Sequence, residues 1–318
     1  METVRCNLCG SADNRLAYRM PDARYFPDEV FDVVECTGCG LGFVNPRPTF
    51  AEMSRFYPAE FYDFFERDRR SQERRYRVES SFLRDVELTT TTPRLLDIGC
   101  ANGDFPRYMM SRGWDVEGVE VSETSRPIAD FPVYTTAFPS IPIGEPVFDA
   151  ITAWAVLEHV HDPMGYFQKA GRLLKPGGRF AFLVTNFESV ASRHLFCEDV
   201  PRHLYFFTKE TVRRYLELAG LRMLRVEYSD RIYPMLPINW LRFRLHGVLG
   251  KPYTFQDVPM NRTQFLQSHG MSTTLGASAY WALANPLTAI DRLAAPIVSR
   301  VQKLTRRYGI ATYVATTA

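Results

Sequence analysis

Several features that would mark other protein classes are scarce in this sequence. Cysteine accounts for only six of the 318 residues, which is few for a chain of this length. No uninterrupted apolar run reaches the roughly 18 to 20 residues that span a bilayer. The opening residues, METVRCNLCG, also lack the apolar core of a signal peptide. We therefore expect a cytoplasmic protein.

The excess of one sign of charge over the other is also small. Lys and Arg number 38 against 36 Asp and Glu, so the formal net charge is only +2. A polyanion-binding protein usually shows a larger excess or a basic face, so nucleic acid is disfavoured as a partner. Hydrophobic residues make up 46% and charged residues 23%, which argues against wholesale disorder and a fibrous repeat. The length fits one large domain or two modest ones.

The few cysteines are concentrated near the N-terminus. Four of them form two matched Cys-x-x-Cys-Gly motifs, made by Cys6 and Cys9 and by Cys36 and Cys39. Two such turns supply four thiolates in a tetrahedron, and the glycine after each pair gives the turn its backbone freedom. The pattern predicts a closed, structural Zn²⁺ site, with reduced or redox-active thiols as the alternative. Four thiolates and one Zn²⁺ would lower the net charge from +2 to about zero.

Apolar β-type runs alternate with amphipathic helical stretches over residues 94–232, which predicts a doubly wound, mostly parallel α/β sheet. Seven strands are expected: 94–98, 115–121, 132–134, 148–153, 179–185, 221–229 and 310–315. Three helices are expected between them: 104–112, 163–174 and 208–219. The predicted organisation is a zinc ribbon (1–45), a helical connector or lid (46–93), the core (94–232), a helical cap insertion (233–308) and a final core strand (309–318).

A glycine-containing turn follows the first of these strands, in the sequence Asp97-Ile98-Gly99-Cys100-Ala101-Asn102-Gly103. Such glycines let the backbone approach a ligand at the carboxyl end of a strand, where open α/β sheets bind ligands. Glu120 stands near the end of the second strand, where a carboxylate can accept both hydroxyls of a ribose. The pattern predicts a nucleotide-type site, and a nicotinamide dinucleotide site is the alternative.

Several further motifs occur in order along the chain. They are Phe148-Asp149-Ala150-Ile151, Leu157-Glu158-His159-Val160, Leu174-Lys175-Pro176-Gly177-Gly178 and His203-Leu204-Tyr205-Phe206-Phe207-Thr208. Together with the glycine turn and Glu120, they resemble the class I S-adenosylmethionine-dependent methyltransferases. The resemblance covers about residues 94–232 and the final strand, and it implies a Rossmann-like fold. The cysteine motifs narrow it to a zinc-ribbon subgroup whose relatives include sugar C-methyltransferases.

The resemblance also implies roles for individual residues. Glu120 would hold the ribose of S-adenosylmethionine, Val121 would pack on its adenine, and Phe138 would stack there. The residues that would line the methionine end are Asp97, Gly99, Cys100, Ala101 and Gly103. Two departures from the family pattern stand out: Ala101 replaces the usual middle glycine, and residues 135–138 lack the acidic residue that often meets the adenine amino group.

Methyl transfer from a sulfonium is an in-line displacement, so much of the rate comes from positioning, with a base where the acceptor carries a proton. His159 and His161 follow the fourth predicted strand, and His203 precedes a late helix at the same sheet edge. We favour His203 and His159 as the general base and Tyr205 as a phenol that positions the acceptor. A structural hydrogen-bonding role is the alternative for each histidine.

The insertion at 233–308 is broken by prolines and carries the basic residues Arg292, Arg300, Lys303, Arg306 and Arg307. A cap over the acceptor is our first interpretation, and a dimer face or a membrane-surface contact with a lipid-linked acceptor is the second. We expect a methyltransferase for a small-molecule acceptor of sugar or glycan type, either free or linked to a nucleotide or lipid. The alternatives are an RNA or protein methyltransferase whose ribbon grips the polymer, and a binding protein without catalysis. The oligomeric state stays open.

Overall fold

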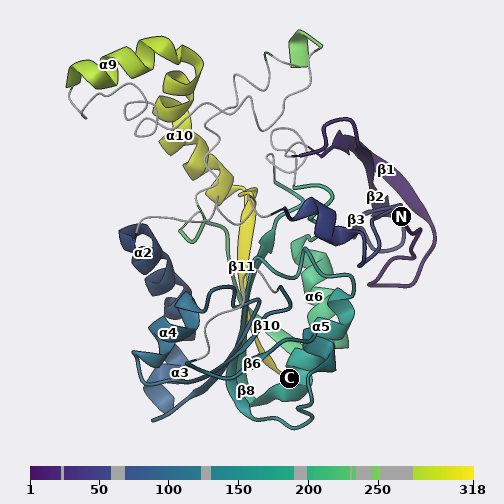
Figure 1. Ribbon diagram of the computed structural model, residues 1–318, viewed down its shortest axis with the longest axis vertical. Coiled ribbons are helices and arrows are strands. Elements are labelled where there is room, and N and C mark those ends of the chain that lie inside the picture. Colours follow the sequence, from purple (N-terminus) through teal and green to yellow (C-terminus); the bar gives the residue numbers. More distant parts are fainter. Residues whose placement is uncertain are drawn as a thin grey trace.

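The computed structural model contains a large central sheet, a small sheet near the N-terminus and a pair of helices that precede the last strand (Figure 1). It describes residues 1–22, 25–58, 69–122, 130–189, 199–229, 231–233, 245, 247–250 and 275–318. The core is continuous from the small sheet into the large one, since their buried apolar residues form one cluster.

The central sheet has seven strands, and their edge-to-edge order confirms the predicted doubly wound fold. The order is β10 (Leu221–Glu227), β11 (Ile310–Thr317), β8 (Leu174–Thr185), β7 (Phe148–Trp154), β4 (Arg94–Ile98), β5 (Asp115–Val119) and β6 (Val133–Tyr134). β4 pairs in parallel with β5 and β7, whereas β11 is antiparallel to both β8 and β10. The carboxyl ends of the parallel strands therefore share one edge of the sheet.

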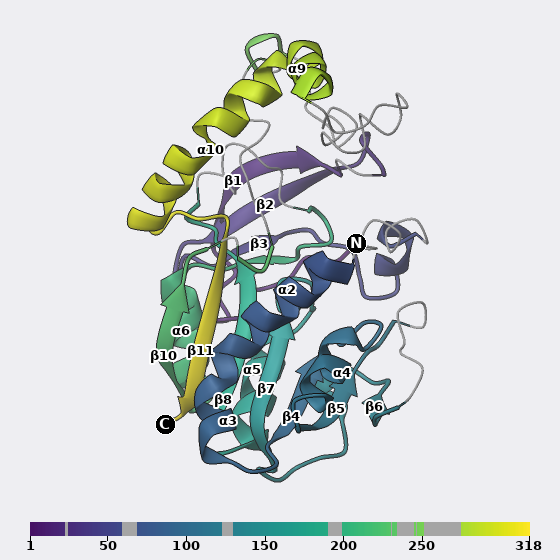
Figure 2. The same ribbon diagram turned by 90° about the vertical axis from the view of Figure 1, so that its left-hand side faces the viewer.

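Helices cover both faces of this sheet (Figures 1 and 2). On one face lie α2 (Arg69–Ser80), the short 3₁₀ turn η2 (Ser81–Leu83), α3 (Arg84–Thr89) and α4 (Asp104–Met110); on the other lie α5 (Pro163–Leu173) and α6 (Lys209–Leu218). Strands with helices on both faces are buried on both faces, so β7 and β8 consist mainly of continuous apolar residues. As predicted, Thr208 caps α6 by accepting a hydrogen bond from the Thr211 backbone N–H.

The small sheet is formed by β1 (Asn14–Pro21), β2 (Val30–Cys36), β3 (Gly42–Val44) and β9 (Tyr205–Phe206). β9 comes from the range that we assigned to the methyltransferase core, and it pairs with β3 in the ribbon. The ribbon sheet is thus completed by a strand that lies far away in the sequence. The 3₁₀ turns η1 (Met53–Phe56) and η3 (Phe138–Ser140) lie in loops outside the sheets.

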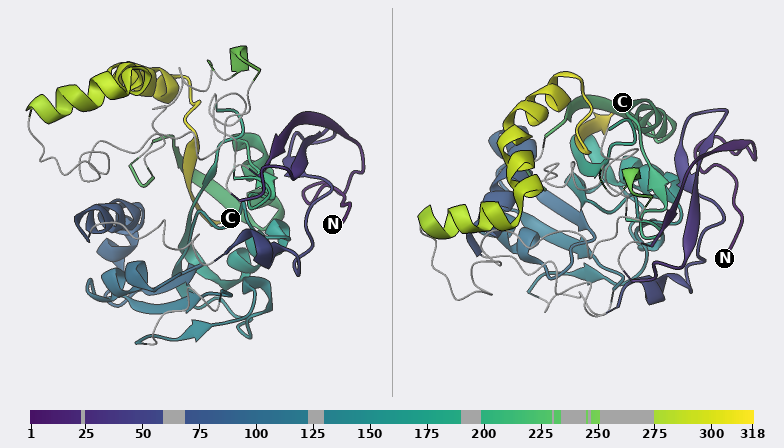
Figure 3. Two further views of the ribbon diagram at one scale, coloured as in Figure 1. Left: turned by 45° about the horizontal axis from the view of Figure 1, so that its top comes forward. Right: turned by 90° about the horizontal axis from the view of Figure 1, so that it is seen from above.

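The described part of the insertion before β11 contains two helices, α9 (Leu275–Ala284) and α10 (Pro286–Leu304) (Figure 3). Residues 234–244, 246 and 251–274 of this insertion lie outside the described residues. Ile310, at the start of β11, pairs with Thr185, at the end of β8, so α10 leads into the sheet at its carboxyl edge. Within the described ranges, no helix combines the length and the apolar character needed to cross a membrane.

Candidate functional site

The glycine turn follows β4 at the carboxyl edge of the sheet. The backbone N–H groups of Gly99 and Cys100 donate to the carbonyl of Val119, at 2.7 and 3.1 Å, which ties the turn to the neighbouring strand. Gly99 has a φ of +70°, and a Cβ there would come within 2.6 Å of a methyl carbon of Val156. A glycine is therefore required on both conformational and steric grounds.

Ala101, the departure from the family pattern, adopts a left-handed φ of 47°. This conformation costs a non-glycine residue some free energy, but it remains within the small left-handed region that sterics allow. Gly103, with a φ of 83°, immediately precedes α4 and completes the turn. The backbone therefore runs through the turn from strand to helix with an alanine at the middle position.

Asp97 is the last polar side chain of β4 and is almost fully buried. The Thr152 hydroxyl donates to its carboxylate at 2.5 Å. Burial raises the pKa of Asp97 to about 8, and the negative charges of Glu79 and Glu120 also act to raise it. The carboxyl is thus placed where a positively charged ligand would favour its ionised form.

Glu79 is a member of this acidic group that we did not predict. Arg75 and Glu79 stand four residues apart, a spacing typical of ion pairs on a solvated helix. Arg75 Nε donates to Glu79 Oε1 at 2.6 Å, but the Glu79 side chain is fully buried. The buried apolar residues Val78, Phe82 and Leu83 mark the inward face of this region and are the signal that could have revealed it.

Glu120 lies just after β5, and its side chain connects the glycine turn to the loop that follows β5. Its carboxylate accepts hydrogen bonds from the backbone N–H groups of Ala101, at 3.0 Å, and Ser122, at 2.7 Å. These bonds fix the carboxylate beside the glycine turn. The next residue, Val121, is 48% exposed, which leaves its side chain available to a ligand.

Two of the predicted cofactor residues lie inside the core. Phe138 has no exposed surface and packs against Tyr166, with ring centroids 5.6 Å apart. Its ring is enclosed by the core and has no exposed face on which an adenine could stack. Cys100 is also buried, with its Sγ facing Gly118 closely enough that a Cβ there would lie 2.7 Å away. It therefore contributes to the site through its backbone.

The two histidines that we favoured as the base are neighbours. The rings of His159 and His203 meet edge to face, with centroids 4.6 Å apart. His159 Nδ1 lies 3.0 Å from the Tyr57 hydroxyl and 3.1 Å from the carbonyl of Arg202. Burial and, to a smaller extent, the adjacent His203 lower the pKa of His159 to about 3. His159 is therefore neutral throughout the physiological pH range.

The histidine pair is connected to the glycine turn through Val156. The backbone N–H of His159 donates to the carbonyl of Val156, the residue whose side chain faces Gly99. The segment that follows His203 is bound to the segment that carries His159, because the backbone N–H groups of Leu204 and Tyr205 donate to the carbonyl of Glu158. Glu158, His159 and His203 also bring potential metal-ligating atoms within 4.8 Å of one another.

Tyr205 and His161 have hydrogen-bond partners other than the histidine pair. The Tyr205 hydroxyl accepts a hydrogen bond from Arg47 at 2.8 Å and donates to the carbonyl of His161 at 3.2 Å. The side chain is almost fully buried in β9. His161 Nε2 lies 3.1 Å from the carbonyl of Pro48. Both side chains thus join the ribbon end of the chain to the core, and the role of Tyr205 in positioning an acceptor stays a prediction.

The four cysteines of the two motifs come together at the tip of the ribbon. Cys6 Sγ and Cys39 Sγ lie 3.4 Å apart, Cys9 Sγ and Cys36 Sγ lie 3.5 Å apart, and all four fit within 4.8 Å. Tetrahedral Zn²⁺ with bonds of about 2.3 Å places its sulfur ligands about 3.8 Å apart. The cluster therefore fits zinc, and Gly10 and Gly40 take the positive φ values that the matched turns require.

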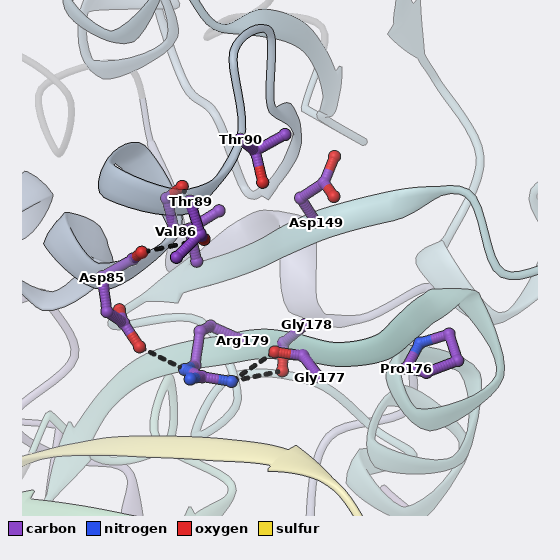
Figure 4. Close-up of a pocket in the computed structure, with 9 residues that line it drawn as sticks. All are labelled: Asp85, Val86, Thr89, Thr90, Asp149, Pro176, Gly177, Gly178 and Arg179. Atoms are coloured by element: carbon purple, nitrogen blue, oxygen red, sulfur yellow. Dashed lines mark hydrogen bonds and ion pairs between the residues drawn. The ribbon is translucent and has the colours of Figure 1, made fainter.

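A small polar pocket lies at the opposite, amino-terminal edge of the sheet (Figure 4). Its volume is about 190 Å³. The residues that line it are Asp85, Val86, Thr89, Thr90, Asp149, Pro176, Gly177, Gly178 and Arg179. An ion pair of 2.7 Å between Arg179 and Asp85 crosses one side of it. Because Asp149 is at the start of β7, this pocket is separate from the glycine turn.

The seven-stranded sheet and its glycine turn define a class I, Rossmann-like methyltransferase. The family described as "Methyltransferase domain" matches residues 50–226. This is more than half of the chain, and the chain belongs to that family. The match confirms the methyltransferase domain expected from the sequence.

Several named methyltransferases are similar to this chain. A ubiquinone biosynthesis O-methyltransferase from Alkalilimnicola ehrlichii is 34% identical over 103 residues, covering 29% of this chain and 42% of that protein. One from Ruegeria pomeroyi is 36% identical over 181 residues, covering 49% of this chain and 71% of that protein. The chain thus spans less than half of the first relative's length. A solved structure of an S-adenosylmethionine-dependent methyltransferase from Archaeoglobus fulgidus is 16% identical, with a TM-score of 0.46, covering 76% and 94% of the two chains.

Proposed function

We propose that the protein transfers a methyl group from S-adenosylmethionine to a hydroxyl oxygen of a small-molecule acceptor, with His203 taking the hydroxyl proton. The observation that carries the proposal is the contact of His159 and His203, 4.6 Å apart, in segments anchored beside the glycine turn. The O-methyltransferase names of the relatives support oxygen as the methylated atom. The predicted sugar or glycan character of the acceptor stays a prediction.

The cofactor would lie across the carboxyl edge of β4 and β5. Asp97 and the backbone of Gly99–Gly103 would surround the methionine end, Glu120 would accept hydrogen bonds from the ribose hydroxyls, and Val121 would cover the adenine. The buried carboxyl groups of Asp97 and Glu79 make this end of the site acidic. An acidic surrounding suits the sulfonium and ammonium groups of the cofactor, since opposite charges in a buried site attract strongly.

The two histidines would have different roles in the reaction. A group with a pKa of about 3 is a weak base near neutral pH, which disfavours His159 as the proton acceptor. We therefore assign His159 to positioning, through its Nδ1 contacts and its ring contact with His203. The oxygen of the acceptor would form a bond to the methyl carbon as the carbon–sulfur bond breaks. The proton passes to His203, and S-adenosylhomocysteine is the leaving group.

We also propose that Cys6, Cys9, Cys36 and Cys39 hold one Zn²⁺ as a structural ion. Four thiolates fill the tetrahedral coordination of the metal, so it would stabilise the ribbon without an open position for catalysis. Asn7 lies between the first two cysteines and forms hydrogen bonds with Asp162, Met164 and Tyr215 in the core. The metal would thus fix a turn that docks directly onto α5 and α6.

The test uses labelled cofactor. S-adenosylmethionine carrying an isotopic methyl group is incubated with separate panels of hydroxylated small molecules, RNA and protein extracts, and products are detected by mass spectrometry. We expect label on an oxygen of a small molecule. His203→Ala should reduce turnover at least about tenfold while calorimetry shows unchanged binding of S-adenosylhomocysteine. Label on RNA or protein alone, or full turnover by His203→Ala, would refute the proposal.

A further inference from the structure

Helix α10 has an unusual distribution of side chains. The large aliphatic residues Ile290, Leu293, Ile297, Val301 and Leu304 recur at intervals of three or four residues, so they share one face. All five are more than half exposed, and Leu293 and Leu304 exceed 80%. The polar residues Thr288, Asp291 and Gln302 are instead almost completely buried. A helix of a water-soluble protein normally shows the opposite arrangement.

The charged residues beside this aliphatic face are all basic. Arg300 and Lys303 are exposed in the last turns of α10, and Arg306 and Arg307 follow them, also exposed. Asp291 is the sole acidic residue between 275 and 307, and it points inward. α9 adds further exposed apolar groups in Tyr280 and Leu283, and its sequence contains no charged residue.

Charge is distributed unevenly over the whole chain. The insertion at 233–308 contains nine Lys and Arg against two Asp, a formal excess of seven positive charges. Since the net charge of the chain is +2, the remaining residues carry a formal excess of five negative charges. The small net charge therefore conceals a basic segment attached to an acidic catalytic body.

We propose that α9 and α10 form a docking surface for an anionic lipid bilayer, on which α10 lies in the plane of the interface. An amphipathic helix with basic residues beside its aliphatic face buries those side chains among acyl chains while its cations meet anionic headgroups. Nucleic acid would match the charge but leave the aliphatic residues exposed to water. A second copy of the chain would bring two basic segments together.

The position of the helices determines which edge of the sheet would face the bilayer. α10 leads into β11 at the carboxyl edge of the sheet, the edge that carries the glycine turn and His159. Figures 1 and 3 show both helices projecting beyond this end of the sheet. A bilayer bound to them would face the cofactor edge. The inference goes beyond the proposed methyl transfer, and its test does not depend on the identity of the acceptor.

The experiment measures binding of the full chain to sedimented vesicles. Vesicles of phosphatidylcholine alone are compared with vesicles that also contain phosphatidylglycerol, at low and high salt. The variants are Leu293→Glu with Ile297→Glu, and Arg300→Glu with Lys303→Glu. Leu88→Glu, on α3, is the matched control because Leu88 and Leu293 are equally exposed, at 81%. Binding of S-adenosylhomocysteine by calorimetry verifies that each variant is folded.

We expect binding to the anionic vesicles that weakens at high salt. Each double variant should bind on the order of tenfold or more weakly, whereas Leu88→Glu should bind like the unmodified protein. Absence of vesicle binding would overturn the proposal. It would equally be overturned if Leu293→Glu with Ile297→Glu instead dissociated a dimer seen by light scattering, or abolished binding to RNA. If the unmodified protein binds the anionic vesicles but not S-adenosylhomocysteine, the proposed function is contradicted and this inference is supported.

Discussion

Asp22 and Arg202 form a fully buried ion pair, with 2.7 Å between Asp22 Oδ1 and Arg202 Nη2. Asp22 directly follows β1 of the ribbon, and Arg202 directly precedes His203. Arg202 also pairs with Asp199, and its carbonyl faces His159 Nδ1 at 3.1 Å. The ribbon therefore determines where the loop that carries His203 lies.

This relationship predicts that Asp22→Ala destabilises the protein strongly. Removing Asp22 leaves the buried guanidinium of Arg202 with Asp199 as its remaining carboxylate partner, and breaking a buried ion pair costs up to about 3–5 kcal/mol. Arg15→Ala is the matched control, because the Arg15–Glu35 pair joins β1 and β2 at the surface, where such pairs contribute about 0–1 kcal/mol. Urea unfolding monitored by circular dichroism gives both values. Equal losses for the two variants would contradict the assigned role of the pair.

The contact of Gly99 with Val156 predicts a specific effect on cofactor binding. Gly99→Ala should weaken binding of S-adenosylhomocysteine by about tenfold or more, because the new methyl group displaces Val156 and distorts the turn. Gly113→Ala is the control, since Gly113 also has a positive φ but open space around it. It should lose about 1–2 kcal/mol of stability and retain binding. Calorimetry that finds equal affinities for the two variants would refute the steric explanation.

Asp97 predicts a pH dependence with a definite sign. Its pKa is about 8 in the folded protein, against an ordinary value of about 3.9 in an unfolded chain. Between these values folding takes up a proton, so the contribution of Asp97 to stability falls as pH rises from about 4 to about 8. Asp97→Asn should therefore flatten the decline in the free energy of unfolding over this range. An unchanged pH profile in denaturant titrations would contradict the raised pKa.

The same carboxyl couples cofactor affinity to pH. Binding of a cationic ligand favours the ionised form, so affinity for S-adenosylmethionine should rise as pH increases from 6 towards about 8. Asp97→Asn should bind more weakly and lose this slope. Calorimetry at several pH values measures both. A steep slope that persists in Asp97→Asn would assign the titration to another group.

The cysteine cluster predicts one zinc ion per chain. Cys36→Ser combined with Cys39→Ser should abolish the bound metal, whereas Cys100→Ser should retain it because Cys100 lies outside the cluster. Elemental analysis of the purified proteins gives the metal content directly. Loss of the metal should also lower thermal stability, since zinc binding contributes to folding free energy. Unchanged zinc in the double variant would exclude the assigned ligands.

The sequence was most informative where signals are local. The strand from Arg94 to Ile98 and the capped helix after Thr208 have the predicted bounds within a residue or two. Continuous apolar runs and a threonine cap are properties of neighbouring residues, so they can be recognised without knowledge of the fold. The glycine turn is equally local, and Val156 explains why Gly99 is needed.

The features that escaped prediction depend on contacts between distant segments. Glu79 has the spacing of a solvated ion pair, and only the packing of α2 against the sheet shows that it is buried. Phe138 and Tyr205 have side chains suited to ligand contact, yet their neighbours enclose them. β9 is too short to show any periodicity, and its pairing with β3 spans about half of the chain. No local pattern records such long-range contacts.

The β3–β9 pairing has a consequence for protein engineering. Residues 1–45 look like a detachable cassette in the sequence, but their sheet is completed by Tyr205 and Phe206. Gly42 also faces the ring of Phe187 so closely that a Cβ would lie 2.8 Å from it. A chimaera that exchanges the ribbon between relatives must therefore exchange these distant residues with it. The unit of recombination in this protein is discontinuous in the gene.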